Sequence, residues 1–358
     1  MTYTQEEINL IVLSDIAELT YKARRALLSD LSSASPDFEK CKNFLIKTLS
    51  DGVYNKVKAS FYDAEYRREV LRLIEENGVK CVTYFSDFYP ESLKNTDSPP
   101  IVLYCKGDVS LLKSDCFAVV GSRRTLPKAL AECKKISGEL SEKFTVVSGI
   151  AEGADSAALE GALGCGGKVI SVLANGLGKV YPAINYNLQQ RIAEKGLLIS
   201  EYPYGYPPKP YYFPERNRII AGLSRGVLVV SAGIKSGALI TAEYAFEYDR
   251  EVFAFPYSSG VTSGAGCNKL IKTNAHLTEN ILDIFAEFGL DFNVCDEPLE
   301  KAELEFLDAL QASDGGFLYD VAQKLGKRVF DILPVASALE IKGLIVKCGG
   351  NRYSMVNR

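Results

Sequence analysis

The sequence predicts a doubly wound α/β fold, in which helices cover both faces of a parallel sheet. Short apolar segments alternate with helical segments from residue 117 to about residue 285. Most of the apolar segments are continuous runs, as is typical of parallel strands buried on both faces. Glycine-rich loops follow several of them, as expected at the ligand-binding edge of such a sheet. The expected strands are 117–120, 145–147, 169–173, 197–200, 227–230 and 252–255.

Residues 1–76 are predicted to form a helical module ahead of this sheet. Apolar residues keep helical spacing in the segments 8–19, 38–49 and 62–76. Modules of this kind serve protein or nucleic-acid contacts, and a plain packing role is the alternative.

The sheet domain is expected to span residues 77–290. It opens with a connecting segment in which Pro90, Pro99 and Pro100 disfavour helix. The apolar run 101–104 then favours a strand.

A linker, 291–298, is expected to lead to a last domain at 299–358. Three helical segments are followed there by a hairpin, and this order predicts a winged helix. The helix that would read DNA carries mostly apolar side chains around Lys327 and Arg328, so protein contact or a structural role is favoured over groove binding. The expected elements are helices 299–311, 317–325 and 329–341 and strands 344–347 and 353–356.

Composition limits the possible functions. The chain has 358 residues, of which 47% are hydrophobic and 24% charged, as in ordinary globular proteins. A net charge of -4 argues against a generally basic nucleic-acid coat, so a polyanion would have to bind a local patch. No apolar segment is long enough for a membrane span and no basic leader opens the chain, so we expect a cytoplasmic protein without a membrane partner.

Cysteine and histidine usage predicts no metal and no cofactor. The nine cysteines are scattered without a C-x-x-C pair, and the chain has one histidine, His276. Neither a disulfide framework nor a zinc site is therefore indicated.

The segment from Phe213 to Tyr244 concentrates the chemistry. Pro214 suits the first position of a helix, which would place Arg216 and Arg218 in the first turn. Cations there oppose the helix dipole, so a bound anion would explain them. A salt-bridged surface helix is the alternative interpretation.

The glycine-rich loops predict a ligand crevice at the carboxyl ends of the strands. Their backbone N–H groups can face a phosphate, and a tight turn that serves helix packing is the alternative for Ser148, Gly149 and Ser236. The residues that we expect to contact nucleic acid are Gly121, Ser122, Arg123, Arg124, Ser148, Gly149, Arg216, Asn217, Arg218, Lys235, Ser236 and Gly237.

A loop rich in tyrosine and proline precedes the first helix of this segment. Six aromatic residues and five prolines lie between residues 202 and 214. A single strand of DNA needs flat side chains for its bases as well as cations for its phosphates, and Tyr211, Tyr212 and Phe213 are the stacking candidates. A proline-rich arm packed on the domain is an equally good interpretation.

Several blocks of the sequence resemble the DNA-processing protein A family (DprA, also called Smf), and the resemblance covers nearly the whole chain. The blocks keep a specific order and spacing. They are Tyr89-Pro90-Glu91-Ser92-Leu93, Pro99-Pro100, Leu103-Tyr104, Val120-Gly121-Ser122-Arg123, Val147-Ser148-Gly149, Tyr181-Pro182, Ser200-Glu201, Phe213 to Ser224, Lys235 to Ala242 and Gly266 to Ile271.

This resemblance implies an extended Rossmann-like sheet domain between a helical, SAM-like module and a C-terminal winged helix. It also implies a homodimer that binds single-stranded DNA, protects incoming DNA in natural transformation and loads the RecA recombinase onto it. No catalytic reaction is implied, so we expect that the chain is not an enzyme.

The chain departs from the family pattern at four places. Glu152 stands where many relatives have a basic residue, and Ala158 where they tend to have a histidine. Pro256-Tyr257 replaces Pro-Gly, and Asn274-Ala275 replaces Gly-Ala. These changes predict a less positive crevice and a lower DNA affinity or a shifted DNA path.

Two other function classes remain open at the sequence level. Related Rossmann-like domains hydrolyse the N-glycosidic bond of nucleoside monophosphates, which requires a placed carboxylate. The candidates are Glu152, Asp155, Glu201, Glu215 and Glu243. The second class is an interaction scaffold whose crevice has lost its ligand.

Overall fold

The chain divides into two compact units, residues 1–290 and 291–358. The computed structural model describes residues 3–16, 18, 19, 23, 24, 49–290, 300–313, 316–341, 344–348 and 350–355. The expected linker 291–298 and most of the expected helical segment 38–49 lie outside these residues. The finer division of the first unit at residue 76 stays a prediction.

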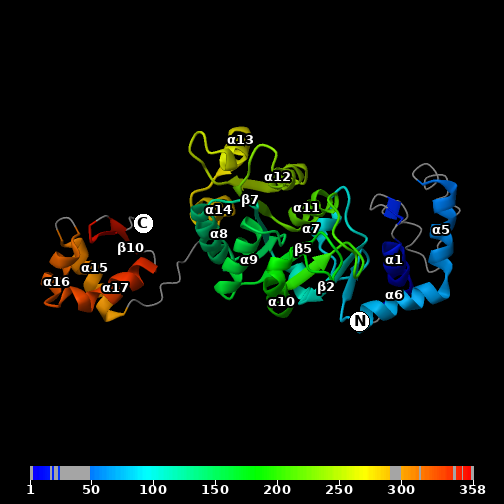
Figure 1. Cartoon of the computed structure of the whole chain (residues 1–358), viewed down its shortest axis with the longest axis horizontal. Coiled ribbons are helices and arrows are strands. Elements are labelled where there is room, and N and C mark those ends of the chain that lie inside the picture. The colour runs from blue at the N-terminus through cyan, green and yellow to red at the C-terminus, as the bar shows by residue number, and fades with distance from the viewer. Residues whose placement is uncertain are drawn as a thin grey trace. The chain divides into compact units, whose positions relative to one another are not determined.

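One mixed sheet forms the centre of the first unit (Figure 1). In the described residues its strand order is β1-β2-β6-β5-β4-β3-β7-β8-β9. The strands are β1 (Lys80–Thr83), β2 (Val102–Gly107), β3 (Cys116–Gly121), β4 (Thr145–Ser148), β5 (Val169–Leu173), β6 (Leu197–Ser200), β7 (Gly226–Ser231), β8 (Glu251–Ala254) and β9 (His276–Leu277). The six strands predicted from the apolar runs are thereby confirmed.

The parallel part of the sheet reverses its direction of growth next to β3. From β3 the order runs through β4, β5 and β6 on one side and through β7, β8 and β9 on the other. The carboxyl ends of β3 and β7 therefore flank the topological switch point, where doubly wound sheets bind ligands. β2 pairs antiparallel with β6, and β1 with β2, so an antiparallel pair extends the predicted sheet.

Helices lie on both sides of the sheet (Figure 1). Helix α8 packs on α9, and α11 packs on α12. Side chains from the strands and from α11, α12 and α13, among them Val147, Val172 and Ile220, build an apolar core on one side of the sheet. The helices after the first three are α7 (Glu91–Lys94), α8 (Pro127–Leu140), α9 (Ala154–Gly164), α10 (Tyr186–Lys195), α11 (Tyr212–Leu223), α12 (Gly237–Glu247), α13 (Ala265–Thr273) and α14 (Ile281–Glu287).

The first described helices belong to the same compact unit as the sheet. They are α1 (Gln5–Asp15), α5 (Asp51–Tyr62) and α6 (Ala64–Glu76). A capping box of Thr4 and Glu7 starts α1, and the Asp63 side chain caps α6. We call α1, α5 and α6 the N-terminal helices.

The second unit contains the elements expected for the last domain. These are α15 (Lys301–Gln311), α16 (Leu318–Leu325), α17 (Val329–Ile341), β10 (Ile345–Cys348) and β11 (Arg352–Met355). Phe306, Val321 and Leu339 belong to a core of its own. The assignment of this unit to the winged-helix class stays a prediction. Within the described ranges, none of the helices has both the length and the apolar character that crossing a membrane requires.

Candidate nucleic-acid interface

A pocket of about 430 Å³ opens at the switch point between β3 and β7. The loops after β3 and β4 and the N-terminal parts of α11 and α12 form its walls. Nine of the residues predicted to contact or stack on nucleic acid line it. They are Gly121, Ser122, Arg123, Arg124, Phe213, Arg216, Asn217, Ser236 and Gly237. We call this pocket the crevice.

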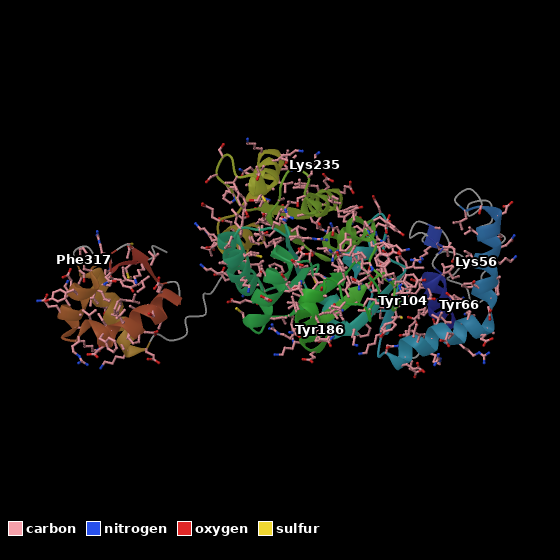
Figure 2. All side chains as sticks on the ribbon, in the orientation of Figure 1. Lys56, Tyr66, Tyr104, Tyr186, Lys235 and Phe317 are labelled. Atoms are coloured by element: carbon pink, nitrogen blue, oxygen red, sulfur yellow. The ribbon has the colours of Figure 1, made fainter. Side chains whose placement is uncertain are left out.

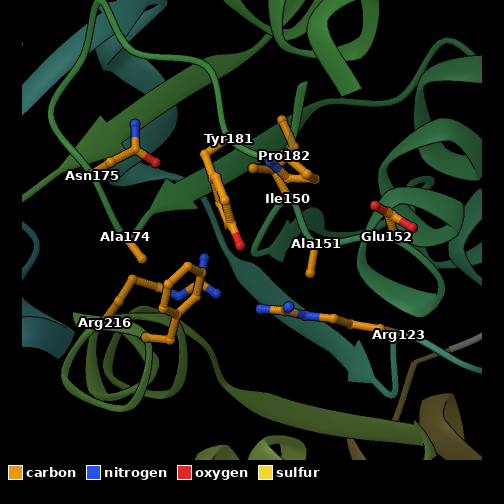
Figure 3. A pocket seen from close by; sticks show the side chains of 10 residues that line it. Arg123, Ile150, Ala151, Glu152, Ala174, Asn175, Tyr181, Pro182 and Arg216 are labelled. Carbon is orange, nitrogen blue, oxygen red and sulfur yellow. The ribbon is translucent and has the colours of Figure 1, made fainter. Parts of the chain in front are cut away.

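A smaller cavity of about 60 Å³ adjoins the crevice on the side of β5. It shares Arg123 and Arg216 with the crevice and adds Tyr181 and Asn175. Figure 3 shows the Tyr181 hydroxyl and the Arg123 guanidinium pointing toward the same space beside Arg216. Arg123 and Arg216 thus line both the crevice and the smaller cavity.

Arg216 lines both cavities, and a hydrogen bond to the strand β5 holds its guanidinium group in place. Its side chain is only 5% exposed, and its Nη1 donates to the carbonyl oxygen of Val172 in β5. Burial lowers the pKa of Arg216, the neighbouring Asp155 counteracts this, and the positive charge of Arg123 adds to the lowering. An anion placed between the two guanidinium groups would offset their repulsion.

Asp155 is the buried counter-charge of this site. Burial raises its pKa above the usual value, while Arg216 and the backbone N–H groups of Ala151 and Gly121 act in the opposite direction. A Cβ atom on Gly149 would overlap the Asp155 carboxylate and come within 2.6 Å of the Arg216 guanidinium nitrogens. Gly149 therefore shapes the site by making room for this pair.

The start of α11 differs from the prediction. The helix begins at Tyr212, so Pro214 is its third residue and Arg216 and Arg218 lie in the second turn. The first four N–H groups of a helix have no intrahelical acceptor, so proline is tolerated at the third position as well as at the first. The dipole argument for an anion at this helix end is accordingly weaker than the sequence suggested.

Arg218 is placed away from the crevice, which corrects the expectation that it belongs to a phosphate track. Its Nη2 donates to the Glu201 carboxylate at 2.5 Å, and the two side chains are 2% and 5% exposed. Burial lowers the pKa of Arg218, but the Glu201 charge outweighs this and raises it overall. The pair is an internal ion pair between α11 and the end of β6.

Ser148 and Lys235 also lie outside the crevice wall. The Ser148 hydroxyl is fully buried and donates to the Val119 carbonyl of the neighbouring strand β3. Lys235 is exposed ahead of α12 and points to solvent (Figure 2). The Ser236 hydroxyl caps α12 by accepting from the Ala238 N–H group. The packing interpretation thus accounts for Ser148 and in part for Ser236.

The aromatic residues before α11 have different surroundings. Tyr212 is buried and stacks on Tyr202, with ring centroids 3.7 Å apart. Tyr211 is 54% exposed, whereas Phe213 enters the crevice wall. The loop is thus partly a packed arm, and Phe213 and Tyr211 are the members that remain accessible.

Tyr181 is a site residue that the sequence reasoning did not select. Its ring meets Phe213 edge-on at 5.6 Å, and the Arg123 guanidinium lies 5.5 Å from the Phe213 ring centre. Tyr181 is 37% exposed. The motif Tyr181-Pro182 was a visible signal, but only the fold brings it beside residues 123 and 213.

The two departures nearest this site have different positions. Glu152 is exposed and lines the smaller cavity. Ala158 is fully buried inside α9. Only Glu152 therefore adds a charge beside the guanidinium groups.

His276 lies at the opposite edge of the sheet, where β9 begins. Glu251 and Glu287 join it, and these three residues form a group with metal-ligating atoms within the described ranges. The Glu251 carboxylate faces Nε2 at 2.9 Å and the Glu287 carboxylate faces Nδ1 at 3.6 Å. Because the carboxylates face different ring nitrogens, the arrangement is that of a histidine bridging two acids.

Comparison with known proteins identifies the family. Residues 80–289 match the family model described as DNA recombination-mediator protein A. This range holds the whole sheet and every residue that lines the two cavities. The chain belongs to this family.

Individual members of the DNA recombination-mediator protein A family support the assignment. DNA processing protein DprA of Streptococcus pneumoniae is 43% identical over 202 residues, which cover 56% of this chain and 72% of the relative. DNA processing protein DprA of Bacillus subtilis is 38% identical over 220 residues, which cover 61% and 74%.

Two solved structures share the fold. The X-ray structure of DprA from Streptococcus pneumoniae has a TM-score of 0.70 and 33% identity, and covers 82% of this chain and 100% of that chain. A structure concerning the single-stranded DNA binding mode of DNA processing protein A from Helicobacter pylori has a TM-score of 0.55 and 30% identity, and covers 60% and 97%.

Proposed function

We propose that the crevice binds single-stranded DNA and that the protein acts as a recombination mediator without a catalytic step of its own. The observation that carries this proposal is the pair Arg123 and Arg216 lining the crevice at the switch point, with the rings of Phe213 and Tyr181 beside them. Guanidinium groups bind phosphate oxygens, and the flat rings offer stacking surfaces for bases.

The rest of the site fits the binding of DNA with little preference for its base sequence. Backbone groups of the loops after β3 and β7 and guanidinium groups line the crevice, and these recognise phosphates rather than base edges. The structure of the Helicobacter pylori relative concerns single-stranded DNA binding by a protein of the same family. A nucleoside hydrolase is disfavoured, because the buried carboxylate of the crevice, Asp155, faces Arg216.

We further propose that the protein works as a homodimer, protects incoming DNA during natural transformation and passes it to the RecA recombinase. Membership of the recombination-mediator family supports this role. Pull-down of RecA in the presence of oligothymidylate tests the RecA contact. Sedimentation of the protein alone tests the homodimer. RecA capture without dependence on DNA, or a monomer at micromolar concentration, would contradict this extension.

A titration with oligothymidylate at several salt concentrations tests DNA binding. If about four phosphates are neutralised, log affinity should fall against log salt with a slope of about -3. Arg123→Ala should weaken binding and make the slope shallower by about 0.7, because one phosphate contact is lost.

Arg225→Ala is the matched control for Arg123→Ala. Arg225 is also an exposed arginine, but it precedes β7 and pairs with Asp115 at the opposite edge of the sheet. Its replacement should leave the affinity and the slope unchanged. A flat salt response of the wild-type chain, or equal effects of the two substitutions, would refute the crevice as the DNA site.

A further inference from the structure

The tyrosine-rich loop connects the N-terminal helices to the crevice. We call residues 202–213 the aromatic arm. At its middle, the Tyr206 hydroxyl donates to the backbone carbonyl of Asp15 at 2.7 Å. Asp15 is the last residue of α1, and its carbonyl has no partner within the helix. A residue of the arm therefore completes the end of α1.

The same end of α1 is fixed inside the N-terminal helices. The Tyr66 hydroxyl of α6 donates to the Asp15 carboxylate at 2.6 Å, and the buried Arg24 donates to the Ile16 carbonyl. Burial raises the pKa of Tyr206 to about 12, so its hydroxyl keeps its proton over the physiological range. The Tyr206 and Tyr66 hydroxyls thus donate to different atoms of Asp15, the backbone carbonyl and the carboxylate, so the bond that holds the arm does not depend on the Tyr66 bond.

On its other side the arm is held by the loop after β5. The N–H of Gly176 donates to the Tyr206 carbonyl at 2.9 Å, and the N–H of Gly205 donates to the Leu177 carbonyl at 2.7 Å. A Cβ atom on Gly176 would overlap the Pro203 carbonyl, and one on Gly178 would overlap the Tyr204 ring. Glycine at both positions allows the arm to lie directly on this loop.

The far end of the arm is the crevice wall. Pro207, Pro208 and Pro210 lie between Tyr206 and Phe213, and their fixed backbone angles make this stretch stiff. Phe213 then lies beneath Arg123 and against Tyr181. The arm therefore leads from the Tyr206 contact to Phe213, the second residue of α11 and the ring that the DNA would meet.

We propose that Tyr206 is a positioning residue through which the N-terminal helices set the affinity of the crevice for single-stranded DNA. This inference rests on the proposed DNA binding. Tyr206 does not line the crevice, so it acts by holding the arm against α1. The N-terminal helices thereby contribute to binding without touching the ligand.

The test compares Tyr206→Phe with Tyr66→Phe in the full chain. Each substitution removes one tyrosine hydroxyl that bonds to Asp15, but only the first bond involves the arm. One net hydrogen bond sets the scale, so Tyr206→Phe should weaken oligothymidylate binding by about two- to tenfold. The salt slope should stay that of the wild type, because no phosphate contact is lost, whereas Arg123→Ala changes it.

A fluorescence measurement separates this inference from the DNA-binding proposal. The chain has no tryptophan, so Phe213→Trp supplies a single reporter at the end of the arm. Without DNA, its emission should shift when Tyr206→Phe is added and stay the same when Tyr66→Phe is added. Failure of the wild type to bind DNA would overturn the proposed function. DNA binding that Tyr206→Phe and Tyr66→Phe change equally, or an emission that both leave unchanged, would overturn the positioning role.

Discussion

Arg216 and Arg218 show how strongly position within one helix decides what a side chain does. Side chains that are two residues apart on an α-helix point in nearly opposite directions. Arg216 consequently reaches the crevice beside Asp155, whereas Arg218 reaches the Glu201 carboxylate inside the domain. Their positions in the motif do not distinguish the two arginines, but only Arg216 lines the crevice.

The buried pair predicts a stability effect at residue 218. Arg218→Met leaves the Glu201 carboxylate buried without its cation, and breaking such a pair costs about 3–5 kcal/mol. Urea unfolding should show this loss in the free energy of unfolding. The exposed pair of Arg225 and Asp115 provides the control, since Arg225→Met should cost no more than about 1 kcal/mol. Similar losses in the two variants would speak against a buried role for Arg218.

Asp155 predicts a pH dependence of binding. Burial raises its pKa in the folded chain, so the folded protein takes up this proton at a higher pH than the unfolded chain does. Its contribution to stability therefore falls as the pH rises through the raised pKa. Below that pKa the neutral carboxyl no longer offsets Arg216, and DNA affinity should rise.

Asp155→Asn isolates this effect. The variant should bind oligothymidylate more tightly at neutral pH and lose the rise in affinity on acidification. Asp115→Asn, at the opposite edge of the sheet, should keep the wild-type pH profile. An Asp155→Asn profile that matches the wild type would assign the pH dependence to other groups.

At the scale of elements, the loop after β4 predicts a local steric effect on binding. Gly149→Ala places a methyl group against the Asp155 carboxylate and the Arg216 guanidinium, so the pair has to move. Overpacking of this kind costs about 1–3 kcal/mol, and we expect DNA affinity to fall with it. Gly164→Ala near the end of α9 meets open space and should be neutral or slightly stabilising. Thermal melts and DNA titrations of both variants check this. Wild-type stability and affinity in Gly149→Ala would show that Asp155 and Arg216 can move apart at little cost.

Elements with a strong local signal are predictable from the sequence, and strands without an apolar run are not. The apolar runs of β3 to β8 predict buried parallel strands, and the glycine-rich loops that follow several of them predict the crevice. β9 has only two residues, and β1 (Lys80–Thr83) begins and ends with a polar side chain, so neither forms a continuous apolar run. The sequence predicts the start of α11 two residues late, at Pro214, because proline favours the first helical position and disfavours helix at the residue before it.

Contacts between residues that are distant in the sequence limit how much of the site can be predicted. Nothing near Arg218 in the sequence indicates Glu201 as its partner, and nothing near Phe213 indicates Tyr181. The contact of Tyr206 with Asp15 spans 191 residues along the chain. Such contacts follow from the order of strands in the sheet, which local patterns do not encode.

For the whole molecule, the separate cores of the two units predict independent behaviour. All residues that line the crevice lie between residues 120 and 241, and the second unit has its own buried cluster around Phe306. A chain that ends at Leu290 should therefore keep its melting temperature and its affinity for oligothymidylate. A loss of affinity beyond about threefold, roughly 0.6 kcal/mol, would assign part of the DNA site to the second unit.

The anchoring of Arg216 to the Val172 carbonyl has a thermodynamic consequence. A long side chain that becomes fixed on folding loses rotamer entropy, which costs about 1.5–2 kcal/mol and lowers the free energy of unfolding. When DNA arrives, Arg216 has little freedom left to lose, whereas the more exposed Arg123 still has to be ordered. Calorimetry should accordingly find a smaller entropic penalty for the phosphate that meets Arg216 than for the one that meets Arg123.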